Sequence, residues 1–126
     1  MAVVCMDTNA LMMPVECDVR VFEELERLLP EADPVVPDAV LRELRNLAGG
    51  ASEEGVAAAV GLDLAERCRP IGVEESHADD AIVSLARAGE CDYVVTNDGP
   101  LRERLLDAGV PVIGLRGRNE LAVTQP

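Results

Sequence analysis

Near the start of the chain, the segment Ala2-Val-Val-Cys-Met-Asp-Thr-Asn9 is an apolar run that ends in three polar residues. The continuous apolar run over residues 2–6 has the length of a single strand. We therefore predict a strand there, with Asp7 directly after its last residue. The rest of the chain must supply the strands that pair with it and the helices that cover it.

Short apolar runs alternate with longer amphipathic ones along the rest of the chain. Strands are expected over residues 2–6, 35–36, 69–73, 93–95 and 110–115, and helices over 19–29, 38–47, 52–67, 76–88 and 100–108. Strands separated by helices of this length form a parallel sheet with helices on both faces. The predicted fold is α/β, a three-layer α/β/α domain with a central parallel sheet. A chain of 126 residues is sized for one domain, over residues 1–126.

The charge of the chain bears on its partners. It has 24 acidic residues against 11 basic ones, all of them arginine, and its net charge is −13. Phosphate binding normally needs a basic face, so this charge argues against a nucleic-acid partner. A second interpretation is a halophilic, archaeal cytoplasm, because at roughly 1 M salt the Debye length falls to about 3 Å and acidic surfaces are screened.

Other features narrow the location and the classes of site. Phe22 and Tyr93 are the only aromatic residues, so base stacking cannot dominate any recognition of nucleic acid. The four cysteines have no C-x-x-C spacing, which argues against zinc, and we interpret them as reduced and mostly buried. We expect a cytoplasmic protein with no membrane partner, because no signal-like segment opens the chain and no apolar run reaches about 18 residues.

Acidic residues fall where the expected strands end and helices begin. Asp7 follows the first strand, Asp98 follows the fourth, and Asp79 opens a helix. In an open parallel sheet these positions face the same edge, where ligands bind. Glu43 sits within the apolar stripe of its helix, three residues after Val40, so we expect it on the edge that faces the core. A carboxylate there is costly unless it is paired, protonated or bound to a metal.

Several carboxylates gathered without nearby cations repel one another, and a divalent ion relieves that repulsion. Oxygen ligands favour Mg²⁺ or Mn²⁺ over zinc. Such ions activate water for attack on a phosphodiester. We therefore predict a catalytic metal site formed by Asp7, Glu43, Asp79 and Asp98.

Each acid also has a purely structural interpretation. Asp7 could close an Asx turn, Asp79 could belong to a capping box that starts at Ser76, and Asp98 could cap a helix. Glu43 could pair with Arg42, Arg45 or Arg102. His77, the only histidine, is expected to be exposed or capping rather than catalytic.

Four segments, in order, resemble the acidic motifs of PIN-domain nucleases: Met6-Asp-Thr-Asn9, Pro37-Asp-Ala-Val-Leu-Arg-Glu-Leu44, Ala78-Asp-Asp-Ala-Ile82 and Val95-Thr-Asn-Asp98. The resemblance runs over essentially the whole chain, and it places the metal-binding acids of the family on the four residues above. Thr8, Asn9, Asp80 and Asn97 are expected to orient those carboxylates. Arg102, Arg104, Arg116 and Arg118 are the candidates for contacts with RNA phosphates.

The C-terminal part is similar to PIN nucleases of the small-subunit processome type, which cleave precursors of ribosomal RNA. The similar segments are Thr96-Asn-Asp-Gly-Pro-Leu-Arg-Glu-Arg-Leu105, Gly109-Val-Pro-Val-Ile-Gly-Leu115 and Arg116-Gly-Arg-Asn119. The chain departs from some of these relatives in lacking their zinc-binding cysteines. The resemblance implies an endoribonuclease that acts on an rRNA precursor, in a homodimer or beside an assembly factor.

Two alternatives remain from the sequence. VapC-type toxins share the fold and the acids, and an antitoxin would then be the partner. A catalytically weak RNA-binding module in ribosome assembly is an interpretation of another class, and it predicts RNA binding that survives removal of metal. Receiver domains are excluded because they need a lysine, and haloacid-dehalogenase-type phosphatases because Asn9 stands where their second acid belongs.

Overall fold

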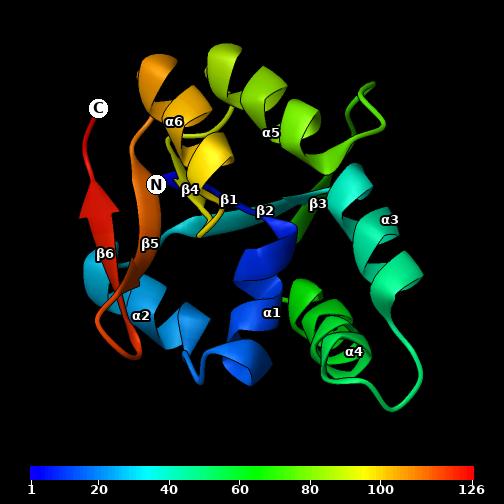
Figure 1. Ribbon diagram of the computed structural model, residues 1–126. Coiled ribbons are helices and arrows are strands. Elements are labelled where there is room, and N and C mark those ends of the chain that lie inside the picture. Colours follow the sequence, from blue (N-terminus) through cyan, green and yellow to red (C-terminus); the bar gives the residue numbers. More distant parts are fainter.

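The computed structural model describes all residues, 1–126, and contains a central six-stranded sheet between helices (Figure 1). The strands are β1 (Val3–Met6), β2 (Asp33–Pro37), β3 (Arg69–Ile71), β4 (Tyr93–Val95), β5 (Val112–Arg116) and β6 (Glu120–Thr124). The helices are α1 (Thr8–Glu16), α2 (Val21–Leu28), α3 (Asp38–Leu47), α4 (Glu53–Ala65), α5 (Ala78–Arg87) and α6 (Gly99–Asp107).

The strand order is β3-β2-β1-β4-β5-β6, so the chain leaves β1 toward one side of the sheet and later returns to β4 on its other side. Ligands of open α/β sheets bind at such a reversal point, outside the carboxyl ends of the two strands. Asp7 and Thr96 directly follow β1 and β4. The topology therefore places both residues at the position where a site is expected.

Helices cover both faces of the sheet. Figure 1 shows α5 and α6 on one face and α1, α2 and α4 on the other, with α3 beside the β3 edge. Val4, Cys5 and Met6 of β1 are completely buried in a cluster of 34 buried apolar residues. This burial on both faces explains why the first strand reads as an uninterrupted apolar run. The three-layer α/β/α fold predicted from the sequence is confirmed.

Two elements were not predicted. Helix α1 follows Asp7 directly, where we expected only a turn, and it contains Pro14. Strand β6 runs antiparallel to β5, so the expectation of a sheet that is parallel throughout is wrong at this edge. Gly117, at a φ of +69°, allows the tight connection between these two strands.

Smaller differences concern the ends of helices and the free cysteines. Asp38 is the first residue of α3, and Pro37 is its N-cap. Ser52 caps α4, since its Oγ accepts a hydrogen bond from Gly55 N at 3.0 Å. All four cysteines are free and three are buried, in line with their interpretation as packing residues. None of the helices is long and apolar enough to cross a membrane.

Candidate active site

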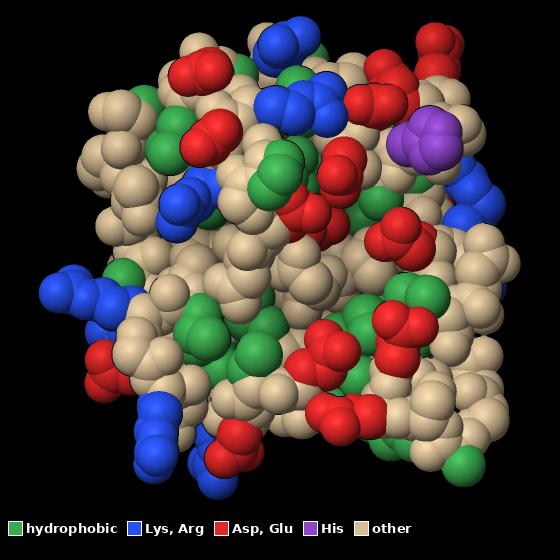
Figure 2. Space-filling model, viewed as in Figure 1, with side chains coloured by type: hydrophobic (Ala, Val, Ile, Leu, Met, Phe, Trp, Pro, Cys, Tyr) green, Lys and Arg blue, Asp and Glu red, His purple; other side chains and the backbone are tan.

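The four predicted acids line one hollow of about 360 Å³ at the carboxyl ends of β1 and β4. The complete lining, here called the carboxylate hollow, is Asp7, Thr8, Asn9, Met12, Glu16, Glu43, Leu47, Glu54, Asp79 and Asp98. The structure therefore brings together side chains from four separate sequence motifs. Figure 2 shows acidic side chains over the middle of this face and over α3 and α4.

Asp7 is the most firmly held of these acids. Its side chain is buried, and it accepts hydrogen bonds from Thr8 N at 2.7 Å, from Asn9 Nδ2 at 2.8 Å and from Thr96 Oγ1 at 2.7 Å. The bond to Thr8 N also caps α1. The carboxylate therefore combines a structural role as a cap with a fixed orientation at the edge of the hollow.

Thr96 is a residue that the sequence analysis missed. It is completely buried, its hydroxyl donates to Asp7 Oδ2, and the same oxygen accepts from Asp98 N at 3.0 Å and from Asn9 Nδ2 at 3.2 Å. One hydroxyl thus joins the first acid to the backbone of the last. The signal available in the sequence was a threonine directly after an apolar strand, in the same position relative to β4 as Asp7 has relative to β1.

The two asparagines extend this network in different directions. Asn9 lines the hollow, and its Oδ1 accepts a hydrogen bond from Asn97 N at 2.9 Å. The side chain of Asn97 instead accepts from Leu115 N of β5 at 2.8 Å. Asn9 therefore contacts a carboxylate directly, whereas Asn97 connects the end of β4 to β5.

The structural interpretations of Asp79 and Asp98 have opposite outcomes. Asp98 caps α6, since its Oδ1 accepts from Leu101 N at 3.0 Å. Asp79 belongs to no capping box, because the cap of α5 is His77 and no side chain bonds to that helix end. His77 is exposed, as expected. Asp79 is half-buried with no structural partner, and it faces the hollow.

Glu43 lies on α3 in a different environment from the one expected. The apolar stripe placed it on the edge that faces the core, but its side chain is exposed, so that prediction is wrong. The hollow is open at this point, so the helix edge that would otherwise be buried meets solvent. None of the salt bridges involves Glu43, so it is not neutralised by the arginines considered from the sequence.

Two more acids line the hollow beside Glu43, and the sequence analysis missed both. Glu16 is the last residue of α1, and Glu54 lies in the first turn of α4. Both occupy ordinary exposed helix ends, and nothing in their local pattern distinguishes them from solvated glutamates. Only the packing of α1 against α4 places them at the site.

Burial, together with the neighbouring negative charge, raises the pKa of two carboxylates in the site. Burial, with smaller contributions from Asp79 and Glu43, raises the pKa of Asp7 to about 6, although the hydrogen bonds from Thr96 and Thr8 oppose this rise. Burial and the neighbouring Asp98 and Glu43 also raise the pKa of Asp79. These carboxylates are therefore close enough to destabilise one another's charge, and a bound cation would relieve that repulsion.

The four predicted phosphate-binding arginines separate in the structure. Arg104 forms an ion pair with Asp80 at 3.0 Å, so Asp80 points to α6 and not into the carboxylate hollow. Arg102 and Arg116 line a different hollow, and Arg118 lies in the exposed turn between β5 and β6. Figure 2 shows basic side chains along the side of the molecule where β5 and β6 lie.

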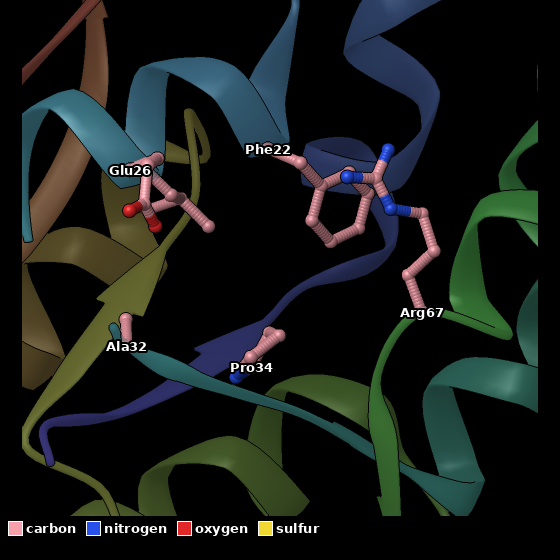
Figure 3. A pocket seen from close by; sticks show the side chains of 6 residues that line it. Phe22, Glu26, Ala32, Pro34 and Arg67 are labelled. Carbon is pink, nitrogen blue, oxygen red and sulfur yellow. The ribbon is translucent and has the colours of Figure 1, made fainter. Parts of the chain in front are cut away.

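A further hollow of about 180 Å³ lies beneath α2, away from these acids. Figure 3 shows the guanidinium of Arg67 above the ring of Phe22, and its carbon is 4.2 Å from the ring centroid. This cation–π contact occupies both groups. Phe22 and Arg67 therefore contact each other and not the carboxylates.

Comparison with known proteins shows which family the chain resembles. A family model described as "PIN like domain" matches residues 4–118. Ribonuclease VapC4 of Methanocaldococcus jannaschii is 30% identical over 114 residues, which cover 87% of each chain. The chain belongs to the PIN-domain nuclease family. The resemblance carried by the four acidic motifs is confirmed, and so is the prediction of an enzyme of this family.

Solved PIN structures agree with the fold. The PIN domain endonuclease Utp24 superimposes with a TM-score of 0.80 at 26% identity, over 98% of this chain and 92% of that chain. VapBC2 from Rickettsia felis, solved with a DNA fragment from its promoter, has a TM-score of 0.63 at 15% identity, over 89% of this chain and 98% of that chain. At that identity the second similarity concerns the fold alone.

Proposed function

We propose that this PIN protein is a metal-dependent endoribonuclease that hydrolyses phosphodiester bonds of RNA in the carboxylate hollow. The observation that carries the proposal is the meeting of Asp7, Glu43, Asp79 and Asp98 at the reversal point of the sheet. Each comes from a different element, and only Asp7 and Asp98 have a structural role as caps. Folding alone does not require the other two acids there.

The donor set fits a hard divalent cation. All the charged groups in the hollow are carboxylates, and the buried Thr8 Oγ1 beside them has no hydrogen-bond partner. As the side chains stand, no three of them form a closed group of ligands. That is compatible with Mg²⁺ or Mn²⁺, because such ions are often held by one or two carboxylates and keep several waters.

The residues of the chain divide the work of the site. Asp7, Glu43, Asp79 and Asp98 would hold the ion, directly or through its waters, and the ion would supply Lewis-acid polarisation of the phosphodiester and an activated water. Thr96 and Asn9 fix the Asp7 carboxylate before any ligand arrives, so it need not reorganise. Because no aromatic residue lines the carboxylate hollow, bases have no stacking platform there, and recognition falls to the RNA backbone.

The substrate we propose is precursor ribosomal RNA, in the cytoplasm. The C-terminal segments that resemble processome-type PIN nucleases support it, and so does the similarity to the endonuclease Utp24 over 98% of the chain. A VapC-type toxin role is the second candidate, favoured by the 30% identity to ribonuclease VapC4. An antitoxin gene immediately upstream would favour the toxin, and a target outside precursor rRNA would do the same.

The test is cleavage of a precursor 16S ribosomal RNA fragment at molar KCl, with Mn²⁺ or with EDTA. Wild type is compared with Asp7→Asn and with Asp107→Asn, the same chemical change at an exposed position outside the hollow. We expect cleavage by wild type and Asp107→Asn in Mn²⁺ only, and none by Asp7→Asn. If RNA is bound but never cleaved, the result would support the RNA-binding module instead. Cleavage that persists in EDTA would contradict the proposed metal dependence.

A further inference from the structure

A second hollow lies beside the carboxylate hollow, and the segment Thr96–Asn97 is part of its lining. It measures about 310 Å³ and is lined by residues of α6, β5 and β6 together with this segment. We call it the arginine hollow, because Arg102 and Arg116 are its only charged lining residues. The Thr96 hydroxyl bonds to Asp7, so the wall of the arginine hollow is in direct contact with the proposed active site.

Most arginines of the chain are already occupied. Five form ion pairs with carboxylates, and a sixth covers the Phe22 ring: Arg20, Arg27, Arg42, Arg69, Arg104 and Arg67. Neither Arg102 nor Arg116 belongs to a salt bridge, although Arg116 lies opposite Glu120 in the β5–β6 register. Five arginines have neither contact, Arg45, Arg87, Arg102, Arg116 and Arg118, and two of these, Arg102 and Arg116, line the same hollow, which contains no acid.

The remaining lining is neutral and suits a ligand with charged oxygens. Asn97 and Thr124 contribute polar groups, and Val123 and Ala122 contribute a small apolar surface. No aromatic residue lines the hollow, so it offers nothing on which a base could stack. Guanidinium groups have a planar fork of donors that matches the oxygens of a phosphate.

We propose that the arginine hollow binds a backbone phosphate of the RNA that flanks the bond to be cleaved. This inference rests on the proposed ribonuclease function, and it assigns the positive charge that an acidic nuclease needs to Arg102 and Arg116. The RNA strand passes over Thr96–Asn97, with one phosphodiester at the carboxylates and a neighbouring phosphate at the arginines. Arg104 has no such role, because it is paired with Asp80 and lies outside the hollow.

The experiment compares two substrates with the intact protein. One is a single-stranded oligoribonucleotide, and the other is bis(p-nitrophenyl) phosphate, a small diester that has no flanking phosphate. The variants are Arg102→Ala/Arg116→Ala and, as the matched control, Arg104→Ala. Circular dichroism and the melting temperature verify that each variant is folded.

We expect the double variant to raise KM for the oligoribonucleotide by about tenfold for each arginine, as for other hydrogen bonds to charged groups. Its hydrolysis of the small diester should equal that of wild type. Arg104→Ala should change KM by less than about threefold, since an exposed ion pair contributes little. Arg102→Lys/Arg116→Lys keeps both charges without the fork, and its KM should lie between those of wild type and the alanine variant.

Binding to the same RNA, measured in an Asp7→Asn background over a series of KCl concentrations, gives a second readout. Loss of a phosphate contact should reduce the slope of log K against log salt by about 1 in the double arginine variant only. Equal KM values and equal slopes for the double variant and Arg104→Ala would overturn the inference while leaving the nuclease intact. If wild type hydrolyses neither substrate, the proposed function itself has failed.

Discussion

The carboxylate hollow and the arginine hollow are linked by the hydrogen bond from Thr96 to Asp7 but are built in different ways. In the first, Asp7 is buried at the end of the central strand and held by three hydrogen bonds. In the second, Arg102 and Arg116 are exposed side chains on α6 and on the last residue of β5, without ion-pair partners.

This difference suits the two tasks that we propose. A reacting centre gains from groups that are fixed before the substrate arrives, and burial among strand ends supplies such rigidity. A subsite for a flexible RNA backbone gains from long side chains that can adapt and that remain charged in water. Under the proposed function, two unpaired arginines beside the acids would let so acidic a chain bind a polyanion.

The largest expected effect comes from removing the charge at the centre of the carboxylate hollow. Asp7→Asn should lower cleavage by more than about 100-fold, because even residues that only support metal ligands commonly contribute 10- to 100-fold. The carboxamide has the same size, so the fold should survive. Steady-state cleavage tests the loss of activity, and circular dichroism tests whether the fold survives. Full activity of this variant would contradict the metal-site assignment.

The pH dependence of stability tests whether the carboxylate hollow carries the strain that its geometry implies. A pKa of about 6 for Asp7, raised from 3.8, means that between about pH 4 and pH 6 the folded protein keeps a proton that the unfolded chain has released. In EDTA the free energy of unfolding should therefore fall as the pH rises through this window, by up to about 3 kcal/mol. In urea titrations of Asp7→Asn, this fall in the free energy of unfolding should be absent. A wild-type curve that rises across the window by the same amount as the variant would contradict it.

The link between the two hollows is probed by Thr96→Val, which replaces a buried hydroxyl by a methyl group of nearly the same size. Asp7 loses a donor and Asp98 N loses its acceptor, so we expect activity to fall 10- to 100-fold and stability by about 1–3 kcal/mol. Since the Thr96 bond lowers the pKa of Asp7, that pKa should rise further in the variant. Thr96→Ser keeps the hydroxyl and is expected to retain most activity, and equal losses in both variants would point to packing instead.

The smallest expected effect concerns the segment Thr96–Asn97 where it lines the arginine hollow. A Cβ on Gly114 would lie 3.1 Å from Thr96 O and 3.4 Å from Asn97 Oδ1, so Gly114→Ala should displace this segment slightly and cost about 1 kcal/mol. We expect KM for RNA to rise, with hydrolysis of the small diester changed less. Gly72→Ala, where the added atom meets nothing within 4 Å, is the control. If both variants behave as wild type, the contact at Gly114 is unimportant.

Local patterns in the sequence determined much of this protein. The apolar runs and amphipathic stretches predicted every strand except β6 and every helix except α1. Because parallel strands end at a common edge, the four acidic motifs predicted that Asp7, Glu43, Asp79 and Asp98 would meet, and their side chains line one hollow.

Other features were decided only by the tertiary structure. Helix α1 has five buried residues and Pro14, so it lacks the polar face by which amphipathic helices are recognised. Strand β6 depends on its pairing with β5, and Glu16 and Glu54 reach the site only because α1 packs on α4. Thr96 joins Asp7, and Arg104 is separated from Arg102, through contacts between residues far apart in the chain. A sequence pattern reports the environment of a residue along its own helix or strand, whereas hydrogen bonds and ion pairs between elements depend on how those elements pack.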